Sequence, residues 1–116
     1  GTNREEIDMV DTKSVIHITD DAFDKVVAQG VTVVDFWADW CMPCRMQGPI
    51  IESVAAKMGN EAKVGKLNTD ENPMTPGRFG ITGIPTMIFF KDGAEAKRLV
   101  GVQSEDVIVD TLKSLL

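Results

Sequence analysis

The chain's two cysteines, Cys41 and Cys44, are separated by two residues in the stretch DFWADWCMPCRM. Thiols at this spacing can form a structural disulfide, supply half of a metal site, or act as a redox-active dithiol. A structural disulfide acts mainly on the unfolded chain, and a loop of about four residues contributes only about 2 kcal/mol. Strain in so tight a ring lowers that contribution further, so the purely structural interpretation is less favoured.

A metal site is incomplete with the residues that this chain offers. Zinc in a structural site takes four Cys or His ligands, and the sequence supplies Cys41, Cys44 and a distant histidine, His17. Arg45 follows the second cysteine, where the haem-attachment pattern requires histidine. We therefore predict no metal site within one chain, although a site shared between two chains stays open. We interpret His17 as an ordinary strand side chain.

The elements predicted around the cysteines favour the dithiol interpretation. VTVVDFWA, residues 31–38, is almost continuously apolar and β-branched, which is typical of a central strand covered on both faces. Apolar residues then recur at helical spacing from Met46 to Met58, and Gly59 marks the end of that helix. The cysteines therefore open a helix, whose unpaired N–H groups and positive dipole end favour a thiolate.

The position of each thiol in this helix predicts its role. Cys41, at the strand-to-helix junction, is expected to be the nucleophile, and Cys44, one turn further on, is placed to resolve a mixed disulfide. Pro43 fits between them, because a residue in the first turn needs no intrahelical donor. Pro49 falls inside the helix, removes one backbone hydrogen bond and predicts a kink.

The rest of the chain alternates strands and helices. The order βαβαβαββα implies parallel strands joined by right-handed crossovers, with an antiparallel pair at an Asp-Gly turn. We predict an α/β fold with one mixed sheet and helices on both faces. The predicted elements are a strand over residues 14–18, a helix from Thr19 or Asp20 to Gly30, a strand over 62–68, a short helix within 71–80, a hairpin turning at KDG, and a helix capped by Ser104.

Composition bounds the possible functions. At 116 residues, with 43% apolar and 26% charged residues, the chain fits one soluble globular domain. A net charge of -6 disfavours nucleic acid and anionic membranes as partners, and the apolar runs are too short to span a bilayer. We predict a polar N-terminal extension over residues 1–13 and a domain over 14–116. The extension has no segment resembling a signal peptide, so we expect a cytoplasmic protein, unless an upstream signal was removed before Gly1.

The stretch VDFWADWCMPCRM resembles the active-site segment of the thioredoxin family. The resemblance continues through KLNTDENP, FGITGIPTMIFFKDG and VG, and covers roughly residues 15 to 116. It implies a thioredoxin-like fold with a single mixed β-sheet of about five strands. It also implies a protein disulfide reductase, expected to be a monomer, with a redox-active Cys41–Cys44 disulfide and no bound cofactor. The expected partners are disulfide-containing proteins and a thioredoxin reductase that restores the dithiol.

The resemblance also assigns the catalytic residues. It makes Cys41 the attacking thiol, Cys44 the resolving thiol, and Asp35 a buried acid or base that assists Cys44. Lys66 matches the lysine that pairs with this acid in the family. The residues agree, because a carboxylate on a central strand loses its hydration, which raises its pKa. A solvated Asp35 and a surface Lys66 remain the alternative.

Substrate-binding residues are assigned in the same way. Trp40 resembles the family's exposed tryptophan beside the disulfide, while Trp37 is expected to pack under the loop. Ile84–Pro85 resembles the cis-proline segment that faces the disulfide, where backbone groups can pair with an extended substrate peptide. Gly83 and Gly101 match close-approach positions near the active surface. Core packing for the tryptophans and ordinary turns for the glycines remain the alternatives.

Met42 is the main departure from the family, which usually has glycine between the first cysteine and the proline. Together with Pro43, it is expected at the substrate-binding surface, either as an apolar contact for docking proteins or as an exposed residue without consequence.

Three functions are compatible with this sequence. The favoured one is a disulfide reductase of broad substrate range. The second is a dithiol oxidant or isomerase in an oxidising compartment. The third is a binding module that uses the same surface without turnover or holds a metal between two chains.

Overall fold

The apolar run that predicts a central strand forms the middle of the sheet. In the computed structural model, which describes residues 14–116, β2 (Val31–Trp37) is buried along all but its last residue. It pairs in parallel with β3 (Lys63–Asn68) and antiparallel with β4 (Thr86–Lys91). The extension predicted over residues 1–13 lies outside the described residues.

The strands of the described residues form one mixed sheet in the order β1-β3-β2-β4-β5. β1 (Ile16–His17) adds in parallel to β3 at one edge, and β5 (Ala94–Val100) adds antiparallel to β4 at the other. The β4–β5 hairpin turns at Asp92 and Gly93, whose φ values of +48° and +87° suit an Asp-Gly pair. The predicted α/β fold with one mixed sheet is confirmed, whereas the antiparallel pairing of β2 with β4 was not foreseen.

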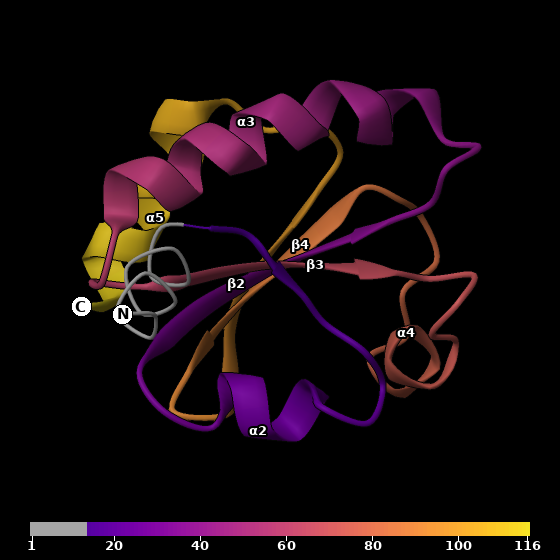
Figure 1. Cartoon of the computed structure of the whole chain (residues 1–116), viewed down its shortest axis with the longest axis horizontal. Coiled ribbons are helices and arrows are strands. Elements are labelled where there is room, and N and C mark those ends of the chain that lie inside the picture. The colour runs from indigo at the N-terminus through magenta and orange to yellow at the C-terminus, as the bar shows by residue number, and fades with distance from the viewer. Residues whose placement is uncertain (1–13) are drawn as a thin grey trace, which may run out of the picture.

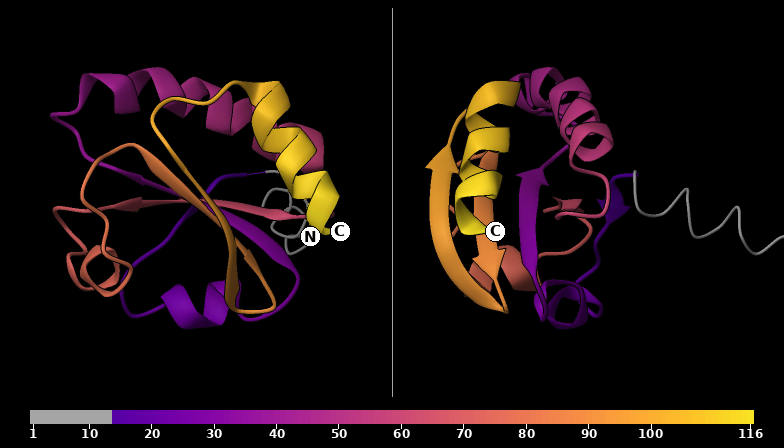
Figure 2. Two further views of the ribbon diagram at one scale, coloured as in Figure 1. Left: turned by 180° about the vertical axis from the view of Figure 1, so that it is seen from behind. Right: turned by 90° about the vertical axis from the view of Figure 1, so that its left-hand side faces the viewer.

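Helices cover both faces of the sheet (Figure 1). α3 (Met42–Met58) and α5 (Glu105–Leu115) lie on one side, and α2 (Phe23–Val27) and α4 (Met74–Arg78) lie on the other. Figure 2 shows α5 beside the C-terminal half of α3. Each face of the sheet has its own apolar core, one under α3 and α5 and one under α2, because successive side chains of a strand point to opposite faces.

The helix predicted to open at Thr19 or Asp20 was placed too early, because α2 begins only at Phe23. The Asp20 carboxylate accepts hydrogen bonds from the N–H groups of Met74, at 3.0 Å, and Thr75, at 2.8 Å. It also accepts one from the Thr75 hydroxyl at 2.6 Å. Asp20 therefore caps the start of α4 instead of its own helix.

The other predicted elements are present with small changes of boundary. β1 contains two residues instead of the five predicted over 14–18. α3 ends at the predicted Gly59 and continues through Pro49. Ser104 caps α5 as predicted, since its hydroxyl accepts the N–H of Val107 at 3.2 Å.

Gly65 on β3 lies where the chain packs too closely for a side chain. A Cβ added there would overlap Ile18 Cδ1 and lie 3.1 Å from the Ile16 carbonyl oxygen. We expect Gly65→Ala to lower the free energy of unfolding by about 1 to 3 kcal/mol through overpacking, as measured by urea denaturation. Gly48→Ala is the control, because a Cβ there meets open space and alanine favours the helix by about 0.5 to 1 kcal/mol. Equal stability of Gly65→Ala and the parent would contradict this account.

Candidate active site

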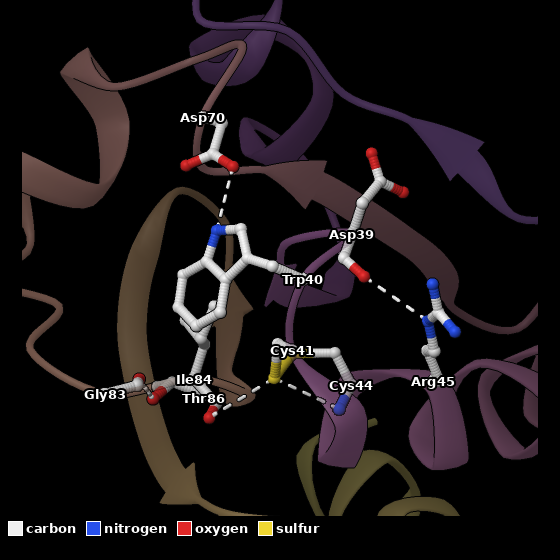
Figure 3. Close-up of a disulfide and its surroundings, with 9 residues drawn as sticks. All are labelled: Asp39, Trp40, Cys41, Cys44, Arg45, Asp70, Gly83, Ile84 and Thr86. Carbon is white, nitrogen blue, oxygen red and sulfur yellow. Dashed lines mark hydrogen bonds between the residues drawn. A yellow bond between two sulfur atoms is a disulfide. The ribbon is translucent and has the colours of Figure 1, made fainter.

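The disulfide lies at the junction between β2 and α3 (Figure 3). Cys41 is the N-cap of α3 and is bonded through its Sγ to Cys44 in the first turn. The same sulfur accepts the N–H of Cys44 at 3.2 Å. Pro43 occupies the first turn between them, where no N–H donor is needed. After reduction, the free N–H groups and the dipole of α3 favour a thiolate at Cys41.

The loop before β4 faces the disulfide. Its Ile84–Pro85 peptide bond is cis, as the resemblance implied. The Ile84 carbonyl oxygen lies 3.7 Å from Cys41 Sγ. In the disulfide this sulfur carries no proton, so the approach is a contact, whereas a reduced thiol can donate a weak hydrogen bond to the same oxygen. Gly101 supports the loop by donating its N–H to the Pro85 carbonyl oxygen at 2.8 Å.

Access to the sulfurs is narrow, since only 4% of Cys41 and 3% of Cys44 are exposed. Trp40 beside them is 69% exposed, and its indole N–H donates to Asp70 Oδ2 at 3.0 Å (Figure 3). A partner must therefore dock on the surface around the disulfide to bring an atom to the sulfur. A groove of about 370 Å³ opens beside Trp40 and is lined by Trp40, Thr69, Pro76, Ile81, Thr82, Gly83 and Ile84.

The glycines and Met42 lie around the same surface. Gly101 has a φ of +90°, a conformation that favours glycine. A Cβ at Gly83 would meet no atom within 4 Å, so the chain's own packing leaves that side of the loop open. The Thr86 hydroxyl donates to the Gly83 carbonyl oxygen and closes the loop (Figure 3). Met42 is 68% exposed and adds an apolar side chain beside the disulfide.

Asp35 is a fully buried carboxyl group on β2. It lies in register with Lys66 of β3 and Met87 of β4. Val33, two residues earlier on β2, belongs to the core under α3 and α5, so Asp35 is on the same face of the sheet. Neither carboxylate oxygen has a hydrogen-bond partner within residues 14–116. Burial raises the pKa of Asp35 from 3.8 to about 7, although the positive charge of Lys66 acts to lower it.

Lys66 neighbours Asp35 in register but does not hydrogen-bond to its carboxylate. The Lys66 Nζ lies 4.3 Å from the centre of the Trp37 ring, an arrangement that a cation–π interaction stabilises. Lys66 therefore acts on Asp35 through its charge. Trp37 is half-buried under the cation, while Trp40 points outward.

Two polar residues at this site were not singled out from the sequence. Asp70 follows β3 and receives the Trp40 indole hydrogen bond. Gln47 is fully buried in α3 and forms two hydrogen bonds with the backbone of Gln103, 56 residues away. A polar residue on the apolar face of a helix signals a specific partner, but the sequence does not indicate which one.

The described residues offer the disulfide as their redox group. Within residues 14–116, no three His, Cys, Asp or Glu side chains are grouped so that they could hold a metal ion. None of the helices in this range has the length and apolar character needed to cross a membrane.

A mixed sheet, a disulfide at a helix start and a cis-proline loop opposite it define a thiol–disulfide oxidoreductase. The family model described as Thioredoxin matches residues 14–114. A thioredoxin of Staphylococcus saprophyticus is 39% identical over 103 residues, which cover 89% of this chain and 99% of the relative. A thioredoxin of Staphylococcus aureus is 41% identical over 99 residues, covering 85% and 95%. The solved structure of a mutant thioredoxin from Halobacterium salinarum has a TM-score of 0.84 at 32% identity, covering 91% and 94%.

The chain belongs to the thioredoxin family. Thioredoxins are protein-disulfide oxidoreductases, and this chain has the Cys41–Cys44 disulfide on which that activity depends. Its function is therefore protein disulfide reduction by thiol–disulfide exchange. The family resemblance based on the segment around the cysteines is confirmed.

The raised pKa of Asp35 makes stability depend on pH. From about pH 4 to about pH 7 the native state keeps a proton that the unfolded state has released, so the free energy of unfolding falls as pH rises through this window. We expect the free energy of unfolding of Asp35→Asn to change much less with pH. At pH 8 it should be about 2 to 4 kcal/mol higher than that of the parent, measured by guanidinium unfolding of the oxidised protein. Asp110→Asn, which alters an exposed carboxylate, should keep the parent slope. A parent-like slope in Asp35→Asn would contradict the assignment.

Proposed function

We propose that the dithiol form reduces protein disulfides in two exchange steps. The Cys41 thiolate attacks one sulfur of the substrate disulfide, forms a mixed disulfide and releases the other substrate sulfur as a thiolate. Cys44 then loses its proton and attacks the Cys41 sulfur, which releases the second substrate thiolate and closes the Cys41–Cys44 disulfide. Two electrons pass from the chain to the substrate.

The hydrogen bond from the Cys44 N–H to Cys41 Sγ is the observation that carries this order of attack. An N–H donor at a helix start stabilises negative charge on the sulfur that it contacts, and that sulfur belongs to Cys41. Cys44 lies inside the first turn, bonded to Cys41, and is therefore within reach of any mixed disulfide that forms there. We therefore propose the same roles that the sequence predicted, with Cys41 as the attacking thiol and Cys44 as the resolving thiol.

We propose that Asp35 accepts the proton of Cys44 during resolution. A carboxyl group with a pKa of about 7 has comparable populations of both protonation states at neutral pH, which suits a general acid or base. The carboxylate has no hydrogen bond to either cysteine in the disulfide form, so the transfer requires a bridging water or a closer approach of the two groups. Lys66 limits the rise of the pKa through its charge.

We propose that substrates dock on the surface around the disulfide. An extended peptide can pair with the backbone of Gly83 and of the Ile84–Pro85 segment, where open space on the loop admits a second chain. The groove beside Trp40 takes an apolar side chain of the peptide. Met42 and Pro43 extend the apolar surface on the helix side, and Gly101 supports the loop from behind.

Family membership also supports the choice of partners. We propose that a thioredoxin reductase restores the dithiol and that disulfide-containing proteins accept its electrons, so that the chain serves electron transport and cell redox homeostasis. We propose a cytoplasmic monomer, without nucleic acid or membrane partners, in keeping with the net charge of -6. The family favours this function over an oxidant, an isomerase or a binding module.

Reduction of insulin disulfides by dithiothreitol, followed as turbidity, tests the function. We expect catalysis by the parent and only the background rate with Cys41→Ser, because the attacking thiolate is absent. With Cys44→Ser, mass spectrometry should find a mixed disulfide that accumulates through Cys41. Trapping through Cys44 in the Cys41→Ser variant would reverse the two roles, and parent-like turbidity with Cys41→Ser would refute the proposed chemistry.

The role of Asp35 is tested by stopped-flow kinetics at pH 7. We expect Asp35→Asn to slow resolution of the mixed disulfide by about 100-fold or more, because general base assistance is lost. The first attack by Cys41 should change by no more than about twofold, since it starts from a thiolate. Asp39→Asn, an exposed acid near the cysteines, is the control and should resolve at the parent rate. An unchanged resolution rate in Asp35→Asn would exclude the proton-transfer role.

A further inference from the structure

Gln47 is a fully buried polar residue on the inner face of α3, one turn beyond Cys44. Its Nε2 donates to the Gln103 carbonyl oxygen at 3.0 Å, and its Oε1 accepts the Gln103 N–H at 2.7 Å. One side-chain amide thus pairs with both backbone groups of a residue in the segment between β5 and α5. We call these two hydrogen bonds the Gln47 clamp. Figure 2 shows this segment rising to the level of α3 before α5 begins.

The segment held by the clamp also supports the loop that faces the disulfide. The Gln103 side chain donates to the Gly101 carbonyl oxygen at 3.4 Å, and the Gly101 N–H donates to the Pro85 carbonyl oxygen at 2.8 Å. The neighbouring Ile84 carbonyl oxygen lies 3.7 Å from Cys41 Sγ. A continuous series of contacts therefore leads from Gln47, in the second turn of α3, to the peptide beside the reactive sulfur.

Two hydrogen bonds to one residue constrain geometry more than an apolar contact does. Apolar contacts are non-directional, whereas a pair of hydrogen bonds sets both a distance and a rotation. A buried amide without partners destabilises a fold, and an apolar residue of the same size would fill the core without needing one. Gln47 therefore favours one orientation of the segment containing Gly101 and Gln103 against α3.

We propose that Gln47 is a positioning residue that sets the gap between the dithiol on α3 and the Ile84–Pro85 segment on which a substrate peptide docks. The inference rests on the proposed exchange mechanism and deepens it. Gln47 acts through the Gln103 backbone and not on the sulfur itself. Loosening the clamp weakens the docking of peptide disulfides, while a small disulfide, which needs no backbone pairing, is attacked as before.

Gln47→Met keeps the size of the side chain and removes both hydrogen bonds of the clamp. We expect the apparent KM for a disulfide-bonded peptide, with dithiothreitol as reductant, to rise about fivefold while kcat stays within about twofold. The rate at which the reduced variant reacts with dithiobis(nitrobenzoate), a small aromatic disulfide, should also stay within about twofold of the parent rate. Hydrogen exchange at the Gly101 amide should accelerate about tenfold, because its bond to Pro85 loses support.

Gln47→Glu tests the same two hydrogen bonds by changing the protonation of the new carboxyl group with pH. It is an independent test if Gln47→Met fails to fold. A protonated carboxyl group offers one acceptor and one donor and can replace both hydrogen bonds, whereas a carboxylate places a negative oxygen against the Gln103 carbonyl. We expect the ratio of its KM to the parent KM to be close to one at about pH 5 and to reach about fivefold at about pH 8.

Ile51→Val is the matched control, because it shortens a fully buried side chain one turn along α3 and leaves the clamp intact. It should keep the parent KM and the parent exchange rate at Gly101, even though it is less stable. Parent-like KM values in both Gln47 variants, or equal losses toward the peptide and the small disulfide, would overturn the positioning role. Failure of the parent itself to reduce either disulfide would instead overturn the proposed function.

Discussion

Burial of β2 on both faces is the constraint on which the site depends. Because apolar cores cover each face, the chain leaves the sheet only where the strand ends, and α3 starts there with Cys41 as its cap. The position of the loop that faces the disulfide depends equally on the antiparallel direction of β4. Phe36, near the end of β2, lies opposite Thr86, the first residue of β4, so the loop that contains Pro85 meets the cysteines at the same edge of the sheet.

Asp35 and Gln47 are buried polar side chains near the dithiol, and their hydrogen bonding differs. Asp35 has no hydrogen-bond partner in the part of the chain that the structure describes, so its charged form is disfavoured and its pKa lies near neutral pH. Gln47 is neutral and both ends of its amide are paired, so it holds a fixed geometry. The unpaired carboxyl group of Asp35 can therefore titrate near neutral pH, whereas the paired amide of Gln47 is held in one orientation.

Most of the fold was predictable from patterns that extend over only a few residues. The end of α3 at Gly59, the Ser104 cap of α5 and the turn at Asp92 each depend on neighbours within one turn of chain. The start of α2 was predicted wrongly because the natural capping residue Asp20 hydrogen-bonds to α4, 54 to 55 residues away. The direction of β4 against β2 was equally hidden, because alternating strands and helices suggest parallel pairing and carry no sign of an exception.

The sequence by itself determined which residues carry the favoured chemistry of this protein. Two thiols three positions apart at the start of a helix lie one above the other, so a strand-to-helix signal around Cys41 and Cys44 already favours a redox-active dithiol. The tertiary structure decided which distant residues contact it. Three contacts join distant residues: Cys41 with Ile84, 43 positions apart, Trp40 with Asp70, 30 positions apart, and Gln47 with the Gln103 backbone, 56 positions apart. Such contacts leave no local or periodic trace, because they exist only after distant strands have ended at one edge of the same sheet.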